Sequence, residues 1–251
     1  MTSRQQRLVF GEVAGEYDAV RPGYPDALLE VVLDYAGGRP ARAVEVGAGT
    51  GLATRLFAPA CGALTCVEPD PEMAAVLSAR FAGTEVRVEV SGFEQWRPPA
   101  GGVDLLYAAQ SWHWVDPVRR WDLAHDALAP GGVIALFGHR YEVADEAIRA
   151  DLDDVYRRLA PSIADDAAFP VRPYGFDIER ATDLRREELV WTVPTSTRDY
   201  LRLLATFSSH RMLDDDVRER LWAGIGEVID VHGGVVGQQI TTGLSLGRRG
   251  D

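Results

Sequence analysis

Residues 43–51 read AVEVGAGTG and decide the fold of this chain of 251 residues. Residues 42–46 are a short apolar run typical of a buried strand, three glycines follow at alternate positions, and residues 52–57 open a helix. A strand, a glycine turn and a helix N-terminus make a site for a polar ligand at the carboxyl end of a parallel strand. Glycine suits such a turn because it adopts positive φ and lets a ligand approach the backbone without a Cβ in the way.

The spacing of the glycines indicates which ligand. A dinucleotide fingerprint, Gly-x-Gly-x-x-Gly, would need a glycine at position 52 after Gly47 and Gly49, but the third glycine is Gly51. Glu45, two residues before the first glycine, would repel a pyrophosphate and suits a cationic ligand. The pattern argues against a nicotinamide oxidoreductase. It resembles the first motif of the class I S-adenosylmethionine-dependent methyltransferases, whose cofactor carries a sulfonium and an ammonium group.

The composition is that of an acidic globular protein. There are 26 basic residues against 38 acidic ones, for a net charge of -12, and 46% of the residues are hydrophobic. Non-specific binding to nucleic acid or to a membrane surface needs a basic field, so both are disfavoured. All the basic residues are arginine, which excludes Schiff-base catalysis by lysine and the lysine of a P-loop.

The cysteines and the apolar stretches of the sequence indicate where in the cell the protein is expected. Cys61 and Cys66 match no zinc spacing, and free thiols suit a reducing cytoplasm. The chain contains neither an apolar stretch of 18 residues nor the apolar run of a signal peptide near residue 1. We expect a cytoplasmic protein without a metal site.

An aromatic arm precedes the glycine turn. Residues 17–25 read YDAVRPGYP, which resembles the small-molecule branch of these methyltransferases that includes the trans-aconitate methyltransferases. In that branch the arm helps to close the active site. The resemblance implies a lid in which Tyr17 and Arg21 meet the cofactor and Tyr24 meets the substrate; the alternative is an arm that only packs on the domain.

Two acidic residues compete to bind the cofactor ribose after the second expected strand, residues 64–67. Glu68 ends the apolar run and lies 21 positions after Gly47, close to the usual spacing for an acid that accepts both ribose hydroxyls. Asp70 precedes Pro71 and is expected to cap the next helix instead. A third strand, residues 86–90, is followed by Phe93 and Glu94. The resemblance implies that these two meet the adenine ring and its amine, although Phe93 also suits plain core packing.

The fourth expected strand, residues 103–109, adjoins the first at the switch point of the sheet, where ligands bind. We expect Ala109 and Gln110 at its end to contact the cofactor. Residues 111–116, SWHWVD, then place His113 between two tryptophans. His113 is a candidate base that orients an oxygen acceptor, or a packing residue, and its aromatic walls should partly desolvate it. The candidate substrate contacts around it are Trp112 and Trp114.

A fifth strand, residues 133–137, follows the turn at residues 129–132. His139 and Arg140 come after it and suit an acidic substrate, the alternative being surface residues. Residues 161–182 look like a long surface segment, which is often functional. Helices are expected at residues 117–128, 146–159, 200–208 and 214–231, and the last strands at residues 189–193 and 240–246.

Five strand–helix alternations and a terminal strand pair predict an α/β fold with a doubly wound, mostly parallel sheet. The resemblance implies seven strands in the order 3-2-1-4-5-7-6, with a helical cap between strands six and seven. We expect a single domain over residues 1–251: an arm to residue 40, a cofactor-binding core over 41–140, and the cap with the terminal strands over 141–251.

The predicted function is methyl transfer from S-adenosylmethionine to a small molecule, with a hydroxyl or carboxylate oxygen favoured as the acceptor. The reaction is an in-line displacement in which the protein mainly supplies position and excludes water. The alternative is an inactive module that binds S-adenosylmethionine and acts through a protein partner.

Overall fold

The computed structural model describes residues 21–164 and 181–250. Seven strands form one sheet in the order β3-β2-β1-β4-β5-β7-β6, which confirms the predicted order. The first five strands pair in parallel, and β7 is antiparallel to both of its neighbours. The strands are β1 (Arg42–Val46), β2 (Ala63–Glu68), β3 (Val86–Val90), β4 (Val103–Ala109), β5 (Leu128–Val143), β6 (Ala181–Ser196) and β7 (Val235–Arg249).

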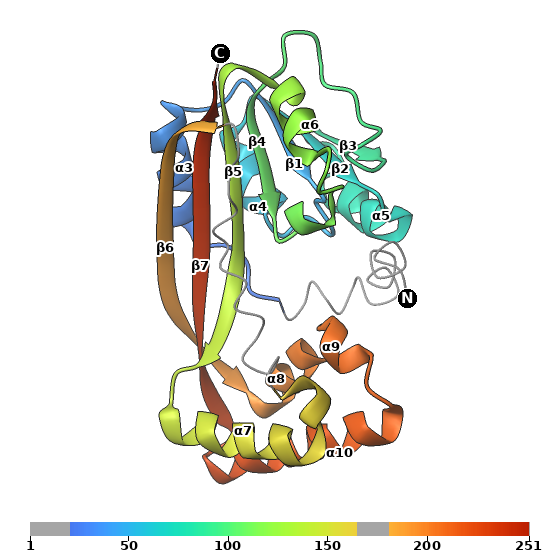
Figure 1. Cartoon of the computed structure of the whole chain (residues 1–251), viewed down its shortest axis with the longest axis vertical. Helices are drawn as coiled ribbons and strands as arrows, with labels where there is room; N and C mark the ends of the chain where they lie inside the picture. The colour runs from blue at the N-terminus through green and yellow to red at the C-terminus, as the bar shows by residue number, and fades with distance from the viewer. Residues whose placement is uncertain (1–20, 165–180, 251) are drawn as a thin grey trace.

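Helices cover both faces of the upper sheet and form a separate cap at its lower end (Figure 1). Side chains of a strand alternate between the two faces, so β1 sends Ala43 toward α3 and α4 and Val44 toward α6. The helices of the upper part are α3 (Asp26–Ala36), α4 (Thr54–Phe57), α5 (Pro71–Arg80) and α6 (Arg120–Ala127). Those of the cap are α7 (Glu146–Leu159), α8 (Thr197–Leu204), α9 (Ser208–Arg211) and α10 (Asp215–Val231).

The last three strands are much longer than predicted. β5, β6 and β7 have 16, 16 and 15 residues and run from the upper sheet into the cap, as Figure 1 shows. The predicted turn at residues 129–132 lies inside β5, where the pairing with β4 shifts between Val103↔Leu128 and Leu105↔Val133. In β5, β6 and β7, antiparallel pairing supplies backbone hydrogen bonds to polar residues beyond the predicted apolar runs. The strands therefore extend further than the hydrophobic pattern indicates.

The cap has its own apolar core, made by α7, α8 and α10, with Leu221, Ile225 and Ile229 fully buried. The prediction of α7 at residues 146–159 is confirmed. This helix lies between β5 and β6, so the cap is not confined to the β6–β7 connection. The segment predicted as one helix at 200–208 contains most of α8 and the start of α9, and α6 begins at residue 120 rather than 117.

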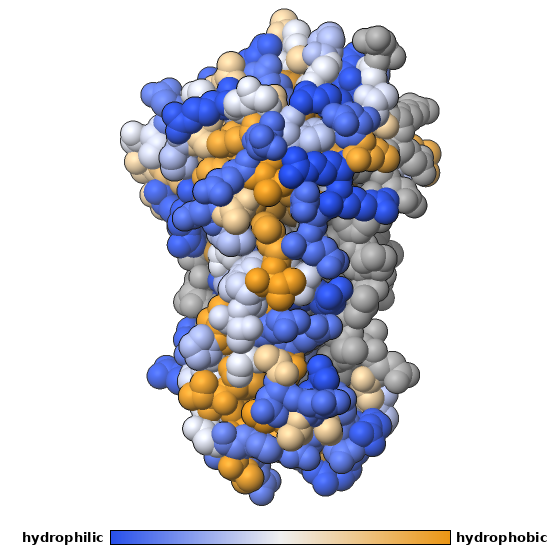
Figure 2. All heavy atoms as spheres, turned by 90° about the vertical axis from the view of Figure 1, so that its left-hand side faces the viewer, coloured by the Kyte–Doolittle hydropathy of each residue, from blue (hydrophilic) through white to orange (hydrophobic). Residues whose placement is uncertain are grey.

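Strand β6 forms an edge of the sheet on the side of the molecule shown in Figure 2. Four charged residues, 185–188, lie between its exposed apolar residues Leu184 and Val190, and Arg185 forms ion pairs with Asp34 and Glu187. Figure 2 accordingly shows a narrow apolar strip in a mostly hydrophilic surface, and charges of this kind protect an edge from pairing with other chains. In the two described ranges, no helix combines the length and apolarity needed to cross a bilayer.

Candidate functional site

The glycine turn joins β1 to α4 at the carboxyl end of the sheet. Gly47, Gly49 and Gly51 have φ of +67°, +57° and +93°, a region that glycine adopts without strain. A Cβ on Gly47 would lie 2.5 Å from the Cβ of Ser111, and one on Gly51 would lie 2.6 Å from Leu77 Cδ1. A Cβ on Gly49 would meet only a Met73 sulfur at 3.9 Å. The outer glycines are therefore required by packing, whereas the middle one borders open space that a ligand can fill.

Glu68, at the end of β2, reaches back to this turn. Its Oε2 accepts the Gly49 N–H at 2.7 Å, and its Oε1 accepts the Asp70 N–H at 2.8 Å. Asp70 instead caps α5, because its Oδ1 accepts the N–H groups of Glu72 and Met73 at 2.9 and 3.1 Å. The assignment of Asp70 as a helix cap is confirmed, and Glu68 is the acid that lies beside Gly49.

Glu45 points away from the open side of the turn, which corrects the expectation that it faces a cation. Strand alternation turns its side chain toward α4, where it is 1% exposed. Its Oε2 accepts the hydroxyl groups of Thr54 at 2.5 Å and Tyr107 at 2.9 Å, with Cys66 Sγ at 3.7 Å. Burial raises the pKa of Glu45 from 4.5 to about 7, and the bonds from Thr54 and Tyr107 oppose this rise. Glu45 therefore supports the turn from beneath.

The expected aromatic contacts lie largely in the core. Trp112 is fully buried and Phe93 is 3% exposed, with their ring centroids 5.9 Å apart. Trp112 also packs on Trp121 of α6 at 5.4 Å. This corrects the expectation that Trp112 contacts substrate: it points into the layer between sheet and helix. Glu94 ties the loop after β3 to the loop after β4, because its Oε1 accepts the Asp116 N–H at 3.0 Å.

The end of β4 lies beside the glycine turn, as the switch-point argument predicted. Gln110, which follows the partly buried Ala109, has φ +57°, an uncommon conformation for a residue with a side chain. Its N–H donates to Phe137 O at 2.9 Å, and its Nε2 donates to His139 O at 3.3 Å. Ser111 Oγ donates to Val46 O. Residues in such conformations cluster at functional sites.

His113 lies beyond this point in a short 3₁₀ turn, Trp112–Trp114. Its ring is 4.6 Å from that of Trp114, which is half-buried. The side chain of His113 is exposed, so the two tryptophans do not wall it off as expected, because one of them turns into the core.

His139 is an interior residue rather than a surface one. It is 5% exposed on the face of β5 that carries Phe137, and its ring stacks on Tyr24 at 4.3 Å. Its Nε2 lies 3.2 Å from Gly23 O and its Nδ1 lies 2.8 Å from Thr242 Oγ1. A carbonyl only accepts, so Nε2 carries the proton and the Thr242 hydroxyl donates to Nδ1.

Burial lowers the pKa of His139 to about 3, so the ring is neutral with both nitrogens bonded. It therefore cannot supply the charge expected for an acidic substrate. Arg140 points to the other face of β5, with its Nε 3.4 Å from Glu142 Oε1.

The described part of the arm bridges the sheet and the cap. Tyr24 meets the Phe137 ring edge-on at 4.9 Å in addition to its stack on His139. Arg21 Nε donates to Thr206 Oγ1 at 3.0 Å, and its guanidinium lies 4.5 Å from the centre of the Phe207 ring. Tyr17 lies outside the described residues, as do residues 165–180 of the surface segment.

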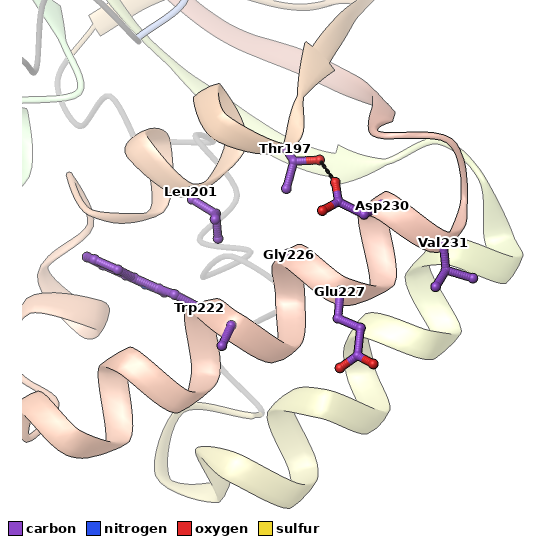
Figure 3. Close-up of a pocket in the computed structure, with 8 residues that line it drawn as sticks. Thr197, Leu201, Trp222, Gly226, Glu227, Asp230 and Val231 are labelled. Atoms are coloured by element: carbon purple, nitrogen blue, oxygen red, sulfur yellow. Dashed lines mark hydrogen bonds between the residues drawn. The ribbon is translucent and has the colours of Figure 1, made fainter.

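Two hollows accompany the site. One, of about 570 Å³, lies between residues 21–25, β6 and α8. A larger one of about 750 Å³ lies between α8 and α10, where Thr197 Oγ1 donates to Asp230 at 2.6 Å (Figure 3). The larger hollow belongs to the cap alone, so its size does not mark it as the site. In the described ranges no three His, Cys, Asp or Glu side chains are grouped to hold a metal ion.

Sequence reasoning missed several residues that build this site. Thr54 and Tyr107 bind Glu45, and Ser111 limits the space at Gly47. Hydroxyl residues scattered along a chain carry no periodic signal. Only the pairing of β1 with β4 brings Tyr107 opposite Glu45.

The raised pKa of Glu45 predicts a pH dependence of stability. Between pH 4.5 and 7 the folded state retains a proton that the unfolded state releases, so the free energy of unfolding falls as pH rises. The rise in pKa corresponds to about 3 kcal/mol. Relative to the wild type, Glu45→Gln should therefore become more stable by up to this amount between pH 4.5 and 8, measured by urea unfolding. The control is Glu188→Gln, at an exposed position on β6. Its difference from the wild type in free energy of unfolding should stay constant over this pH range. A constant difference for Glu45→Gln as well contradicts the prediction.

Comparison with known proteins agrees with this geometry. The profile of the methyltransferase domain family matches residues 44–136, from β1 into β5. An uncharacterized methyltransferase of Mycobacterium bovis is 29% identical over 233 residues, which cover 91% of this chain and 88% of the relative. The trans-aconitate 2-methyltransferase of Variovorax paradoxus is 36% identical over 97 residues, 38% of each chain.

A solved structure shares the fold. It is a protein from Anaeromyxobacter dehalogenans assigned as a type II methyltransferase, with a TM-score of 0.69 and 21% identity over 92% of this chain and 98% of that one. The solved structure and the strand order agree on the fold, and the domain match and the other relatives agree on the activity. The protein is a class I S-adenosylmethionine-dependent methyltransferase, with S-adenosylmethionine as its cofactor.

Proposed function

We propose that this methyltransferase acts on a small molecule and transfers the methyl group to a hydroxyl or carboxylate oxygen. The observation that carries the proposal is the open space at Gly49 beside the Glu68 carboxylate, which fits the cofactor at the switch point of the sheet. The partial relative that is a trans-aconitate 2-methyltransferase supports an oxygen acceptor.

The residues around the turn have distinct roles in this proposal. Gly49 lets the cofactor approach the backbone, and Glu68 binds the ribose; a carboxylate can accept about four hydrogen bonds, so it can hold Gly49 and a hydroxyl together. Gln110 borders the cofactor, while Glu94 and the buried Phe93 shape the adenine side. Glu45 contributes indirectly, by holding Thr54 at the start of α4.

The bound cofactor supplies a methyl group whose bond to the sulfonium breaks as the bond to the acceptor oxygen forms, leaving a neutral thioether. The chain supplies position and keeps water out. Arg21 and Tyr24 hold the arm between β5 and the cap, which supports the role of the arm as a lid. His113, exposed beyond β4, can take the proton of a hydroxyl acceptor; a carboxylate needs no base. Trp114 and Arg140 stay as candidate substrate contacts.

The wider context of the protein is also part of the proposal. We infer that residues 1–251 work as a single domain in the cytoplasm, with a small molecule rather than nucleic acid as the partner. The unpaired Cys61 and Cys66 and the net charge of -12 support this inference.

Gly49→Val should abolish binding of S-adenosylmethionine, because its side chain would occupy the ligand space. Calorimetry with S-adenosylmethionine, its demethylated product and NAD measures this, and wild type should bind only the first two. Gly83→Val is the matched control, since Gly83 also has positive φ, +78°, and an open Cβ position, but lies in the turn before β3. Equal loss of binding in both variants would attribute the effect to backbone strain.

Glu68→Ala should weaken cofactor binding by about 1–3 kcal/mol, the cost of removing a charged acceptor from its donors. Asp70→Ala should lower the free energy of unfolding by about 1 kcal/mol through loss of the helix cap, with a smaller effect on affinity. Calorimetry and urea unfolding of both variants separate these effects. The reverse ranking of affinities would identify Asp70 as the ribose ligand.

The oxygen acceptor is tested by supplying S-adenosylmethionine with a panel of alcohols, carboxylates and amines and measuring the release of S-adenosylhomocysteine. Turnover is expected with an alcohol or a carboxylate. For an alcohol, His113→Ala should lower kcat about 10²–10⁴-fold at unchanged cofactor affinity. His125→Ala, in α6, is the control. Turnover with amines alone would overturn the oxygen assignment, and cofactor binding without any turnover would favour the inactive module.

A further inference from the structure

The hollow of about 570 Å³ between the arm, β6 and α8 has the features of a binding site. Its walls are mainly apolar: the rings of Tyr24 and Trp191, the side chains of Val193 and Leu203, and prolines of the arm and β6. Two polar side chains from the sheet also line it: Gln238 of β7, and Thr195 of β6, whose Oγ1 donates to Val193 O at 3.3 Å.

Gln238 is 2% exposed, and its Nε2 is buried without a hydrogen-bond partner among the described residues. Buried polar groups are almost always hydrogen-bonded, so such an amide needs an explanation. The next residue gives a direct comparison. Gln239 points to the other face of β7, where its Nε2 donates to Glu142 Oε2 at 3.3 Å. Of two adjacent glutamines, the one that lines the hollow is the one whose donor lacks a partner.

The charged groups around the hollow bond to the protein itself. Arg21 donates to Thr206 and lies over Phe207. Asp199 accepts hydrogen bonds from Ser196 Oγ at 2.9 Å and Arg202 Nη1 at 3.3 Å. These two charged groups already have partners within the protein, so the Gln238 amide is the donor of this lining that lacks a partner.

The aromatic rings that line the hollow restrict the shape of a ligand that fits it. His139 lies between Tyr24 and Trp191, with ring centroids 4.3 and 5.3 Å away. It is neutral, since burial lowers its pKa to about 3, and both nitrogens are bonded. It therefore fixes the orientation of its neighbours without adding charge. Flat aromatic walls favour a planar apolar body, and the amide donor favours an oxygen acceptor on it.

A series of contacts runs from the hollow to the cofactor turn, starting at Tyr24, which lines the hollow and stacks on His139. The main chain of His139 accepts from Gln110, and the residue after Gln110 packs against Gly47. We propose that this hollow binds the methyl acceptor, and that the acceptor is a planar, largely apolar molecule with a carbonyl or carboxylate oxygen bonded to Gln238 Nε2. This inference rests on the proposed function, because it assigns the substrate class of the same reaction.

Three probes of similar size test the chemistry: benzoate, benzamide and benzylamine, titrated by saturation-transfer NMR into protein loaded with S-adenosylhomocysteine. The first two carry an acceptor oxygen, and benzylamine does not. Benzoate and benzamide should bind, and Gln238→Leu should weaken them about three- to ten-fold, the value of one hydrogen bond. Gln239→Leu is the matched control and should leave their affinity unchanged. Equal affinity in both variants, absence of binding, or a preference for benzylamine would overturn the proposal.

Thermal unfolding of the unliganded variants separates a binding role from a structural one. A leucine removes a buried donor that lacks a partner, so Gln238→Leu should keep or raise the melting temperature. Gln239→Leu should lower it, because that change breaks the bond to Glu142. If Gln238→Leu does not fold, Val193→Trp fills the hollow from β6 and should abolish probe binding; retained probe binding in that variant overturns the site.

The acceptor role is tested by kinetics, with cofactor affinity measured in parallel. Against an acceptor that the panel shows to be active, benzoate should act as a substrate or a competitive inhibitor. Non-competitive inhibition overturns the acceptor role. If the wild type does not bind S-adenosylmethionine, the proposed function itself is contradicted. Failure of the acceptor site and failure of the proposed function therefore give different results.

Discussion

The site depends on the lack of room between Gly47 and Ser111. Because β1 and β4 are neighbours, Ser111 Oγ donates to Val46 O, and any side chain at position 47 would collide with it. The chain therefore leaves β1 with a positive φ, which brings the Gly49 N–H to Glu68 on the other side of β1. One close contact thus connects the carboxyl ends of three strands and leaves the open space at their centre.

Two carboxylates lie near this turn, Glu45 in β1 and Glu68 at the end of β2, and their surroundings give them different chemistry. Glu68 accepts the backbone N–H groups of Gly49 and Asp70 at the carboxyl end of β2, where it is 5% exposed. Glu45 is enclosed by hydroxyl donors and apolar side chains, and burial raises its pKa toward neutrality. A carboxyl group in such a position suits a structural role, because keeping it charged costs free energy that its hydrogen bonds from Thr54, Tyr107 and Cys66 only partly offset.

Much of the fold was predictable, because apolar runs and glycine spacing report directly on the buried parallel strands and on the turn. The position of α7, the cap role of Asp70 and the place of Gln110 followed from such local patterns and from the switch-point rule. The strand order followed instead from the resemblance of the glycine motif to the methyltransferases. The direction of individual side chains did not. Trp112 and His113 are adjacent, yet one lies in the core and the other in solvent, and a 3₁₀ turn carries no periodicity that separates them. His139 became an interior residue because Gly23 and Thr242, distant in sequence, supply its partners.

The three long strands that continue from the upper sheet into the cap have a mechanical consequence. Residue pairing between β5 and β7 runs without a break from Val133↔Arg248 to Val143↔Gln238, and β6 continues it to Ser196↔Val235. A hinge between the cap and the core would have to bend these paired strands and distort their hydrogen bonds. We therefore expect the two parts to move as one rigid unit. Segments that lie outside these paired strands do not share this constraint. The arm is such a segment, attached by side chains such as Arg21 and Tyr24, and its detachment leaves every strand pair intact.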